Sequence, residues 1–336
     1  MEKKKSNLLK NAFFLAFGMG MMWYVFKDIV WLDFWADVKS MDYRWFAFSA
    51  VFMVTAHFFR ALRWKQLIVS NGHNPSTKNV FASVLFMYVS NLVIPRSGEI
   101  ARCGTIYKYE NIPVPLLIGT VVIERLTDLI SLLVLTVLIV FIRFDVVNIM
   151  YNETALPEIV DSIIDNQMLL ILIVAIGVSG LVAIFILRKK IAEISLIKKI
   201  QPFLDQLKNS FIKLIQLKSK FLYLVYTISI WICYLGMFYI GVFAFAPTEF
   251  LSLSDGIVAF IAGSYGMVAP TPGGVGVWPA IVSEALIVLD PINITVNQAK
   301  SWAGVSFILM TVTTAAAGVI GFIALPFINK DKSSEQ

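Results

Sequence analysis

Eight charged side chains and one histidine interrupt apolar segments of this chain, mostly three or four residues apart. They are His57, Arg60, Arg63, Arg96, Glu99, Arg102, Glu124, Arg125 and Asp128. Such spacing places side chains on one face of a helix. A charge at the centre of a membrane helix costs roughly 2.5–3.5 kcal/mol on insertion scales, so charges kept there pair with one another or carry a function.

Arginines outnumber carboxylates in this set by five to three. Because the guanidinium fork matches phosphate geometry, the surplus favours an anionic ligand, with phosphate the natural match. Two structural alternatives stay open. One is a static network of buried ion pairs, and the other, for Arg63 near the end of its segment, is a side chain that reaches water at the membrane surface. His57 is interpreted as a hydrogen-bonded packing residue or as a proton carrier.

Two segments, 79–109 and 254–290, break within their apolar stretch. The breaks are Asn91-Leu-Val-Ile-Pro-Arg-Ser-Gly-Glu99 and Ala269-Pro-Thr-Pro-Gly-Gly-Val-Gly-Val277. Each follows a helix-like run of about 15 apolar residues, whereas crossing a hydrocarbon core takes about 20. Irregular backbone at that depth survives only where protein buries it or where it lines a wet cavity. The two breaks are therefore the best pointers to function.

The second break carries no charge and offers backbone amides, a hydroxyl group and space. Its candidate binding residues are Thr271, Gly273, Gly274 and Gly276. Tight packing is the alternative reason for these glycines. The Gly-Lys-Ser/Thr ending of a nucleotide-binding loop is absent. On the returning half-helix, Glu284 is a candidate counter-ion or proton-coupling carboxylate.

The composition indicates an all-α polytopic membrane protein. Of 336 residues, 58% are hydrophobic and 15% are charged, whereas a soluble domain is about 45–50% apolar. The net charge of +6 comes from cations at helix ends and in one loop, a pattern typical of membrane topology and anionic lipid rather than of nucleic-acid binding. Two cysteines far apart in sequence indicate neither a disulfide nor a metal site. We expect no cofactor.

Hydropathy predicts six spanning helices in a single transmembrane domain over residues 1–336. The spans are expected at 8–27, 45–69, 116–142, 168–187, 221–246 and 300–326. The first apolar run is long for a signal peptide and lacks a cleavage site, so we interpret it as an uncleaved helix. The lysines among the first ten residues place the N-terminus in the cytoplasm, and the C-terminus is expected on the same side.

The spans on either side of each broken segment end and begin on the same side of the membrane. The two broken segments must therefore be re-entrant hairpins, which enter the membrane from opposite sides. Segment 79–109 enters and leaves from the cytoplasmic side, and 254–290 from the outside. Residues 45–142 and 221–326 become inverted halves, a recurring transporter design in which broken helices meet near the midplane. The basic, amphipathic segment 188–220 is expected to lie on the cytoplasmic surface, with ligand binding as the alternative.

Four motifs, in order, carry a family resemblance. They are Arg60-x-x-Arg63-Trp64, Asn91-x-x-x-Pro95-Arg-x-Gly-Glu99-x-x-Arg102, Glu124-Arg125-x-x-Asp128 and Pro270-x-Pro-Gly-Gly-x-Gly276. Across residues 30–320 this set resembles the transmembrane, flippase-like region of the lysylphosphatidylglycerol synthase family, in its stand-alone form.

The resemblance implies movement of a lipid with a charged head group across the cytoplasmic (inner) membrane. The lipid is expected to be an anionic or aminoacylated phospholipid, or a polyprenyl-phosphate-linked lipid, and relatives are associated with glycosyltransferases and the cell envelope. Two departures matter. The aminoacyl-transferase domain of the two-domain synthases is missing, so we expect no lipid lysylation by this chain alone. The glutamate that commonly follows the glycine-rich motif is replaced by Val277-Trp278-Pro279, and the next carboxylate is Glu284.

We therefore expect a lipid flippase or scramblase rather than an enzyme. The five arginines would bind the lipid phosphate, while the three carboxylates would orient them and take up protons. One alternative is a membrane enzyme acting on a lipid phosphate, with Glu124, Asp128 and His57 as acid and base. The other is a non-catalytic membrane partner of a glycosyltransferase that docks through 188–220. Because no metal-ligand cluster and no nucleophile with a partnered base is recognisable, no catalytic residue is assigned.

Overall fold

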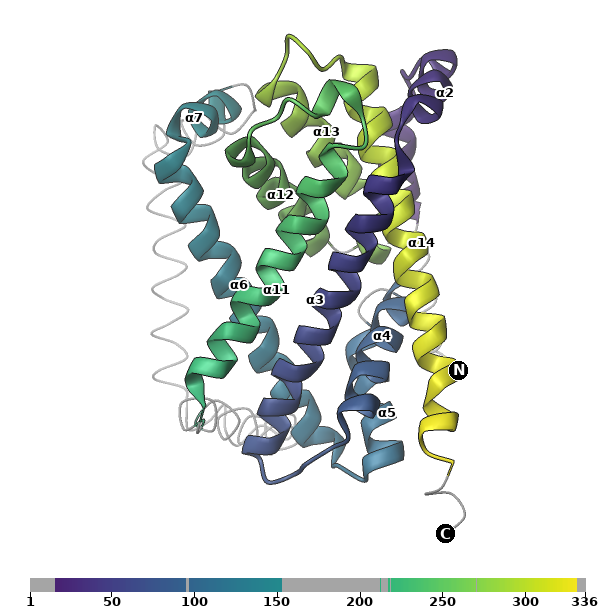
Figure 1. The fold of residues 1–336 in the computed structure, drawn as a ribbon, viewed down its shortest axis with the longest axis vertical. Helices are drawn as coiled ribbons and strands as arrows, with labels where there is room; N and C mark the ends of the chain where they lie inside the picture. The colour runs from purple at the N-terminus through teal and green to yellow at the C-terminus, as the bar shows by residue number, and fades with distance from the viewer. Residues whose placement is uncertain are drawn as a thin grey trace, which may run out of the picture.

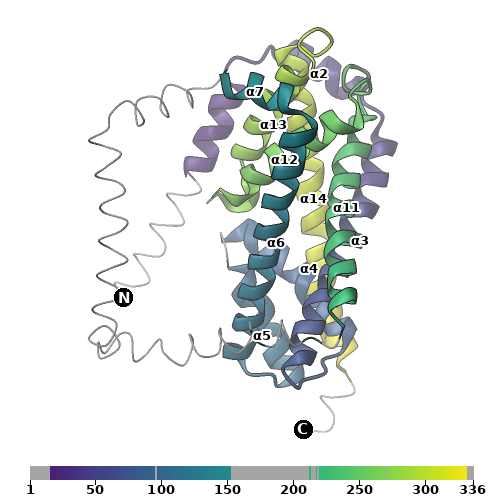
Figure 2. The same ribbon diagram turned by 90° about the vertical axis from the view of Figure 1, so that its left-hand side faces the viewer.

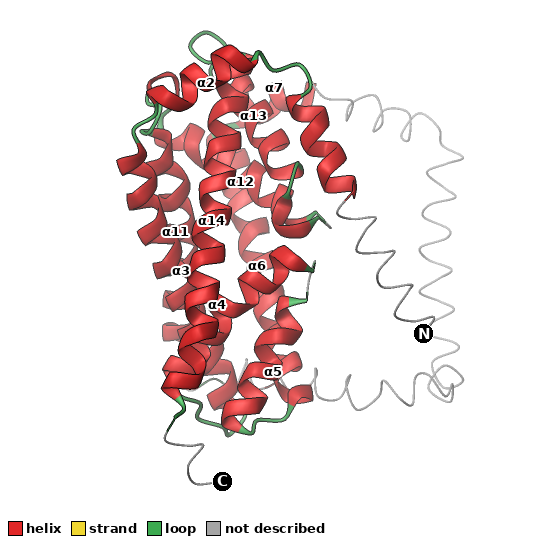
Figure 3. Ribbon diagram, turned by 90° about the vertical axis from the view of Figure 1, so that its right-hand side faces the viewer, coloured by secondary structure: helices red, strands yellow, loops and turns green. Residues whose placement is uncertain are grey.

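The computed structural model describes residues 16–94, 97–152, 212, 217, 219–269 and 271–330. Throughout these residues the chain forms helices, turns and loops and no strand, which confirms the all-helical class (Figure 3). The predicted span 168–187, and nearly all of the basic segment 188–220, lie outside the described residues.

Five helices in the described part are long and apolar enough to cross a membrane. Four match predicted spans, namely α3 (Tyr43–Ser70), α6 (Val114–Ile142), α11 (Lys220–Val242) and α14 (Val296–Ile328). The fifth, Pro272–Leu289, falls within the predicted broken segment 254–290. Of the predicted span 8–27, residues 8–15 lie outside the described part, and the rest contains the apolar helix Ala16–Phe26.

The long helices start at polar caps and continue through apolar sequence. Asp42 accepts a hydrogen bond of 3.0 Å from the amide of Arg44 at the start of α3, and Thr295 and Gln298 form a capping box at the start of α14. Caps of this kind satisfy amides that the first turn of a helix leaves free. Helix α3 packs along α11 (Figure 1), whereas α6 runs beside them and contacts α5 and α12 (Figure 2).

The first predicted break separates two short helices, α4 (Thr77–Val93) and α5 (Gly98–Glu110), which pack against each other as a hairpin. Gly98 is required at the turn, because a Cβ there would lie 2.0 Å from the carbonyl oxygen of Met87. The side chain of Asn91 accepts a hydrogen bond of 2.7 Å from the Gly98 amide. This bond satisfies an amide that the start of α5 would otherwise leave free.

The second predicted break separates α12 (Leu253–Val268) from α13 (Val277–Leu289), with a short 3-10 turn, η2 (Pro272–Gly274), between them. Gly273, Gly274 and Gly276 have φ angles of 58°, 81° and 75°. Glycine adopts such angles without the steric cost that other residues incur. The backbone conformation of this turn is therefore the primary reason for its glycines.

The two hairpins enter the bundle from opposite ends, and their turns meet near its middle (Figures 1 and 3). The η2 turn packs against α4, so closely that a Cβ on Gly273 would lie 2.8 Å from the side chain of Leu92. A Cβ on Gly276 would lie 2.5 Å from the carbonyl oxygen of Gly18, in the helix Ala16–Phe26. The breaks are where the sequence predicted them; entry from opposite faces of a membrane stays a prediction.

Three short elements lie at the end of the bundle where α3 begins, and we call this the α2 end (Figure 1). They are α2 (Trp31–Ser40), α7 (Phe144–Asn152) and η1 (Ala246–Thr248). Here Arg143, which follows α6, donates hydrogen bonds to Ser254 at 3.2 Å and to Asp255, near the start of α12. Its hydrogen bonds to Asp145 hold the pKa of that carboxyl below its usual range. These contacts connect α6 to α12.

At the opposite, α5 end, two asparagines join α14 to the first hairpin. The side-chain amides of Asn79 and Asn329 exchange hydrogen bonds of 2.9 and 2.8 Å, and Asn79 also donates to Glu110 at 2.5 Å. Helix α14 packs along α4 above this pair. The last helix of the chain is therefore held against the first hairpin.

Candidate ligand-binding site in a buried ion cluster

Seven charged residues from three helices converge between the middle of the bundle and the α5 end, and we call them the ion cluster. They are Arg60 and Arg63 on α3, Glu99 and Arg102 on α5, and Glu124, Arg125 and Asp128 on α6. Helix packing brings α5 and α3 onto α6. Arg96, the eighth predicted member, lies outside the described residues.

The inner part of the ion cluster is closed around two carboxylates on α6. Glu124 accepts hydrogen bonds from Nη1 of Arg60 at 2.7 Å and from Nη1 of Arg102 at 3.0 Å. Asp128 accepts from Arg60 at 2.8 Å and from Nη2 of Arg63 at 2.5 Å. The side chains of Glu124, Arg63 and Arg102 are fully buried, whereas Asp128 is 15% exposed. Buried charges of this kind are tolerated only when paired.

Three guanidinium groups against two carboxylates leave this inner part with a formal charge of +1. Some hydrogen-bonding capacity is also unused. Nε of Arg63 and both Nε and Nη2 of Arg102 are buried and have no partner among the described residues. A guanidinium offers five N–H donors. The inner part therefore combines surplus positive charge with free donors, which suits an anion.

The outer part of the ion cluster is more accessible. Nη2 of Arg125 lies 2.5 Å from Oε1 of Glu99, and their side chains are 40% and 24% exposed. The second oxygen of Glu99 is buried and has no partner among the described residues. The predicted set is thus divided into a closed core and an accessible pair.

Aromatic and hydroxyl side chains that the sequence analysis missed surround the ion cluster. Tyr234 accepts from Nε of Arg60 at 3.4 Å, and its hydroxyl lies 3.0 Å from that of Tyr88. Thr227 accepts from Nη1 of Arg63 at 3.4 Å. The ring of Trp64 lies 4.4 Å from the Arg102 guanidinium carbon, within cation–π distance. On α11, Thr227 and Tyr234 lie seven residues apart in apolar sequence, and this helical spacing of polar residues is the signal that could have identified them.

His57 lies one turn before Arg60 on α3 and is 3% exposed. Its ring stacks on Tyr88 with centroids 4.0 Å apart. Neither ring nitrogen has a hydrogen-bond partner among the described residues. An imidazole normally uses at least one nitrogen when buried, so this residue is unusual.

The remaining predicted residues lie in the second hairpin. Thr271 is buried, and its hydroxyl has no partner among the described residues. The amides of Gly274 and Val275 donate within the turn, at 3.4 and 3.1 Å. Glu284 is exposed on α13. The glycines contact Leu92, Met267 and the helix Ala16–Phe26.

Other chemistry was also sought in the described ranges. No group of three or more His, Cys, Asp or Glu residues within them could hold a metal ion. Cys103 and Cys233 are free and buried, on α5 and α11.

One comparison with known proteins identifies a family. A family model described as the lysylphosphatidylglycerol synthase TM region matches residues 11–318. No curated protein and no solved structure matches the chain.

Proposed function

The chain belongs to the family of the lysylphosphatidylglycerol synthase transmembrane region, and from this premise we propose that it moves a lipid between membrane leaflets, as a flippase or scramblase. The lipid carries an anionic or aminoacylated head group, or is linked to a polyprenyl phosphate. The protein acts as a multi-pass protein of the cytoplasmic membrane. The observation that carries this proposal is the surplus of buried guanidinium groups with free N–H donors in the ion cluster.

The lipid phosphate is bound in two steps. Arg125, the most accessible guanidinium among the described members of the ion cluster, makes the first contact. The phosphate then competes with Asp128, the more exposed of the two inner carboxylates, for Arg60 and Arg63. The phosphate can also accept from guanidinium donors that have no partner among the described residues, namely Nε of Arg63 and Nε and Nη2 of Arg102. The acyl or polyprenyl tails remain in the bilayer.

The architecture proposed for this activity is an inverted repeat. Six helices span the membrane, and segments 79–109 and 254–290 are re-entrant, the first from the cytoplasm and the second from outside. The inverted halves are 45–142 and 221–326, with both termini in the cytoplasm. The contact between η2 and α4 supports this arrangement, because it joins the two hairpin turns near the middle of the bundle. Paired broken helices of this kind build substrate sites in transporters.

Transport is passive or ion-coupled under this proposal. A proton is the simplest coupling ion, with His57 and Glu284 as candidate carriers. His57 supports this role because neither of its ring nitrogens has a partner in the part of the chain that the structure describes, and because it lies one turn before Arg60. Thr271, Gly273, Gly274 and Gly276 would contact the head group through the threonine hydroxyl and the backbone.

Reconstitution in proteoliposomes tests the proposal. The wild type is expected to accelerate exchange of a fluorescent anionic phospholipid between leaflets, read by quenching from outside. Arg60→Lys keeps the charge but loses the planar fork, and Arg125→Gln removes the accessible cation. Both variants should lower the exchange rate while remaining folded by thermal unfolding. Arg44→Gln is the matched control, because that arginine is 86% exposed and lies away from the ion cluster.

Wild-type rates in both Arg60→Lys and Arg125→Gln would refute the assignment of the site. Exchange no faster than in protein-free vesicles would refute the transport function itself. Chemical turnover of the lipid by the purified protein would instead favour a membrane enzyme. Transport that appears only after a glycosyltransferase is added would favour a role as its membrane partner.

A further inference from the structure

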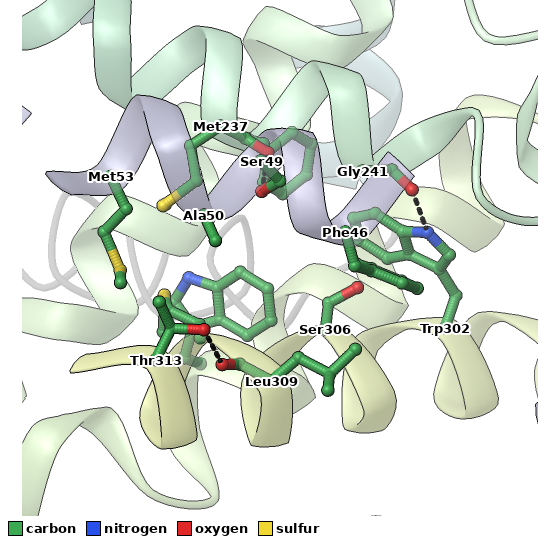
Figure 4. A pocket seen from close by; sticks show the side chains of 13 residues that line it. Phe46, Ser49, Ala50, Met53, Met237, Gly241, Trp302, Ser306, Leu309 and Thr313 are labelled. Atoms are coloured by element: carbon green, nitrogen blue, oxygen red, sulfur yellow. Dashed lines mark hydrogen bonds between the residues drawn. The ribbon is translucent and has the colours of Figure 1, made fainter. Parts of the chain in front are cut away.

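A second space lies along α3 on the other side of His57 from the ion cluster. It is a half-open cavity of about 40 Å³ between α3, α11, α13 and α14, lined on α3 by residues between Phe46 and Met53 (Figure 4). A buried water needs about 10–15 Å³ of such volume. The cavity therefore has room for two or three water molecules in this conformation.

The cavity is lined mainly by apolar side chains and carries no charge, and three hydroxyl groups are set into this lining. Ser49 and Thr313 donate hydrogen bonds to backbone oxygens of Met237 and Leu309, at 2.6 and 2.8 Å. The hydroxyl of Ser306, a third lining residue, is buried and has no partner among the described residues. A buried hydroxyl without a partner is destabilising, so a hydrogen-bonding occupant would stabilise this site.

The cavity and the ion cluster lie along the same two helices. On α3, Met53 lines the cavity, His57 follows one turn later, and Arg60 follows three residues after that. On α11, Met237 lines the cavity and Tyr234 lies three residues before it. Together with Tyr88, whose hydroxyl meets that of Tyr234 at 3.0 Å, these residues form an aromatic layer of His57, Tyr88 and Tyr234. Along α3 and α11 this layer lies between the residues that line the cavity and those of the ion cluster.

The walls of the two spaces correspond under the inverted repeat proposed above. The ion cluster is bounded by α3, α5 and α6, with hydroxyl groups from α11. The cavity is bounded by α11, α13 and α14, with residues from α3. If the two halves are exchanged, α3, α5 and α6 correspond to α11, α13 and α14. The helices around the ion cluster then become the helices around the cavity. The cavity therefore stands where the repeat would place the counterpart of the ion cluster.

We propose that this cavity is a second, uncharged binding site on the lipid's route, which takes water and the hydroxyl groups of the head group. The aromatic layer is the closed barrier between it and the ion cluster. The proposal rests on the transport function proposed above. A glycerol head group and a sugar on a polyprenyl phosphate share this hydroxyl chemistry, and both are tested below.

Accessibility to a small aqueous thiol reagent tests the cavity without any transport assay. In a Cys103→Ala/Cys233→Ala background, Ser306→Cys places a thiol in the cavity wall. Val312→Cys, at a residue of the same helix that is 58% exposed on the bundle surface, is the matched control. Silver ion added to proteoliposomes should react with the first thiol and spare the second, as read by thiol titration after unfolding. Equal protection of both thiols would show that the cavity is not reached by water.

Substitutions that fill the cavity test whether the lipid passes through it during transport. Ser306→Leu and, from the opposite wall, Ala50→Val remove its volume, whereas Val312→Leu does not. The two filling variants should lose exchange of phosphatidylglycerol, or of a polyprenyl phosphate sugar, whichever the wild type moves. Binding of that lipid to the purified protein, measured by mass spectrometry, should be retained because the ion cluster is intact.

The outcomes separate the two proposals. Wild-type exchange in both filling variants, with both proteins folded, would overturn the second site while leaving the transport function standing. An inactive wild type would overturn the transport function, and the silver experiment would still decide whether the cavity is wet.

Discussion

At the residue scale, Glu124 holds the inner ion cluster together. It is fully buried and accepts from arginines on two different helices, Arg60 on α3 and Arg102 on α5. Neither arginine can be buried without a partner at reasonable cost. The carboxylate therefore determines how closely α3 and α5 approach α6, in addition to any role toward a lipid.

Replacing Glu124 by glutamine should destabilise the protein strongly. Removing one partner from a buried ion pair typically costs about 3–5 kcal/mol, because the other charges stay buried and lose their compensation. Thermal unfolding of the purified protein in mild detergent measures the effect. Arg125→Gln is the comparison, since its pair with Glu99 is partly exposed and such pairs contribute about 0–1 kcal/mol. Equal unfolding temperatures for the two variants would contradict the division into a closed core and an accessible pair.

At the element scale, each hairpin depends on glycine, but for a different reason. Between α12 and α13 the need is conformational, because Gly273, Gly274 and Gly276 have positive φ angles. At Gly98 the need is steric, since the start of α5 lies against the carbonyl oxygen of Met87. Close contact between α4 and α5 is what lets Arg102 reach Glu124.

Gly98→Ala should therefore lower the unfolding temperature, because the methyl group has no space and overpacking typically costs about 1–3 kcal/mol. Gly104, on the same helix, is the matched control. A Cβ there meets nothing within 4 Å, and alanine is a better helix former than glycine by about 1 kcal/mol. The two changes should shift the unfolding temperature in opposite directions. A stabilising effect of Gly98→Ala would show that α4 and α5 are not packed as described.

At the scale of the whole molecule, the loops at the two ends of the bundle should face opposite sides of the membrane. The loop between α3 and α4 contains the exposed Asn74, and the loop between α13 and α14 contains Ile292, which is 91% exposed. With Cys103 and Cys233 replaced, Asn74→Cys should react with an impermeant maleimide only in opened cells. Ile292→Cys should react in intact cells. Labelling of both from one side would contradict the proposed topology.

The sequence allowed four long helices, α3, α6, α11 and α14, to be predicted, because span length and hydropathy are local properties. It also located both breaks, since Pro95, Gly98 and the glycine-rich stretch after Ala269 are local signals. The sequence did not predict which helices pack against each other. Nothing in the pattern of α14 shows that it packs on α4, or that Tyr234 on α11 meets Arg60 on α3. Such contacts depend on tertiary packing, so the charged residues were identified while their aromatic neighbours and the division of the ion cluster were not.

The exchange of amide hydrogen bonds between Asn79 and Asn329 has a mechanical consequence. It resembles a base pair, in which two complementary edges meet in one register only. Because it closes the end of a long seam between α4 and α14, the last helix of the chain is fastened to the hairpin of the opposite half. A motion that separated residues 45–142 from 221–326 as two blocks would have to open this seam along its whole length. We therefore expect α4, α5 and α14 to move together, rather than the two proposed halves of the sequence to move as rigid bodies.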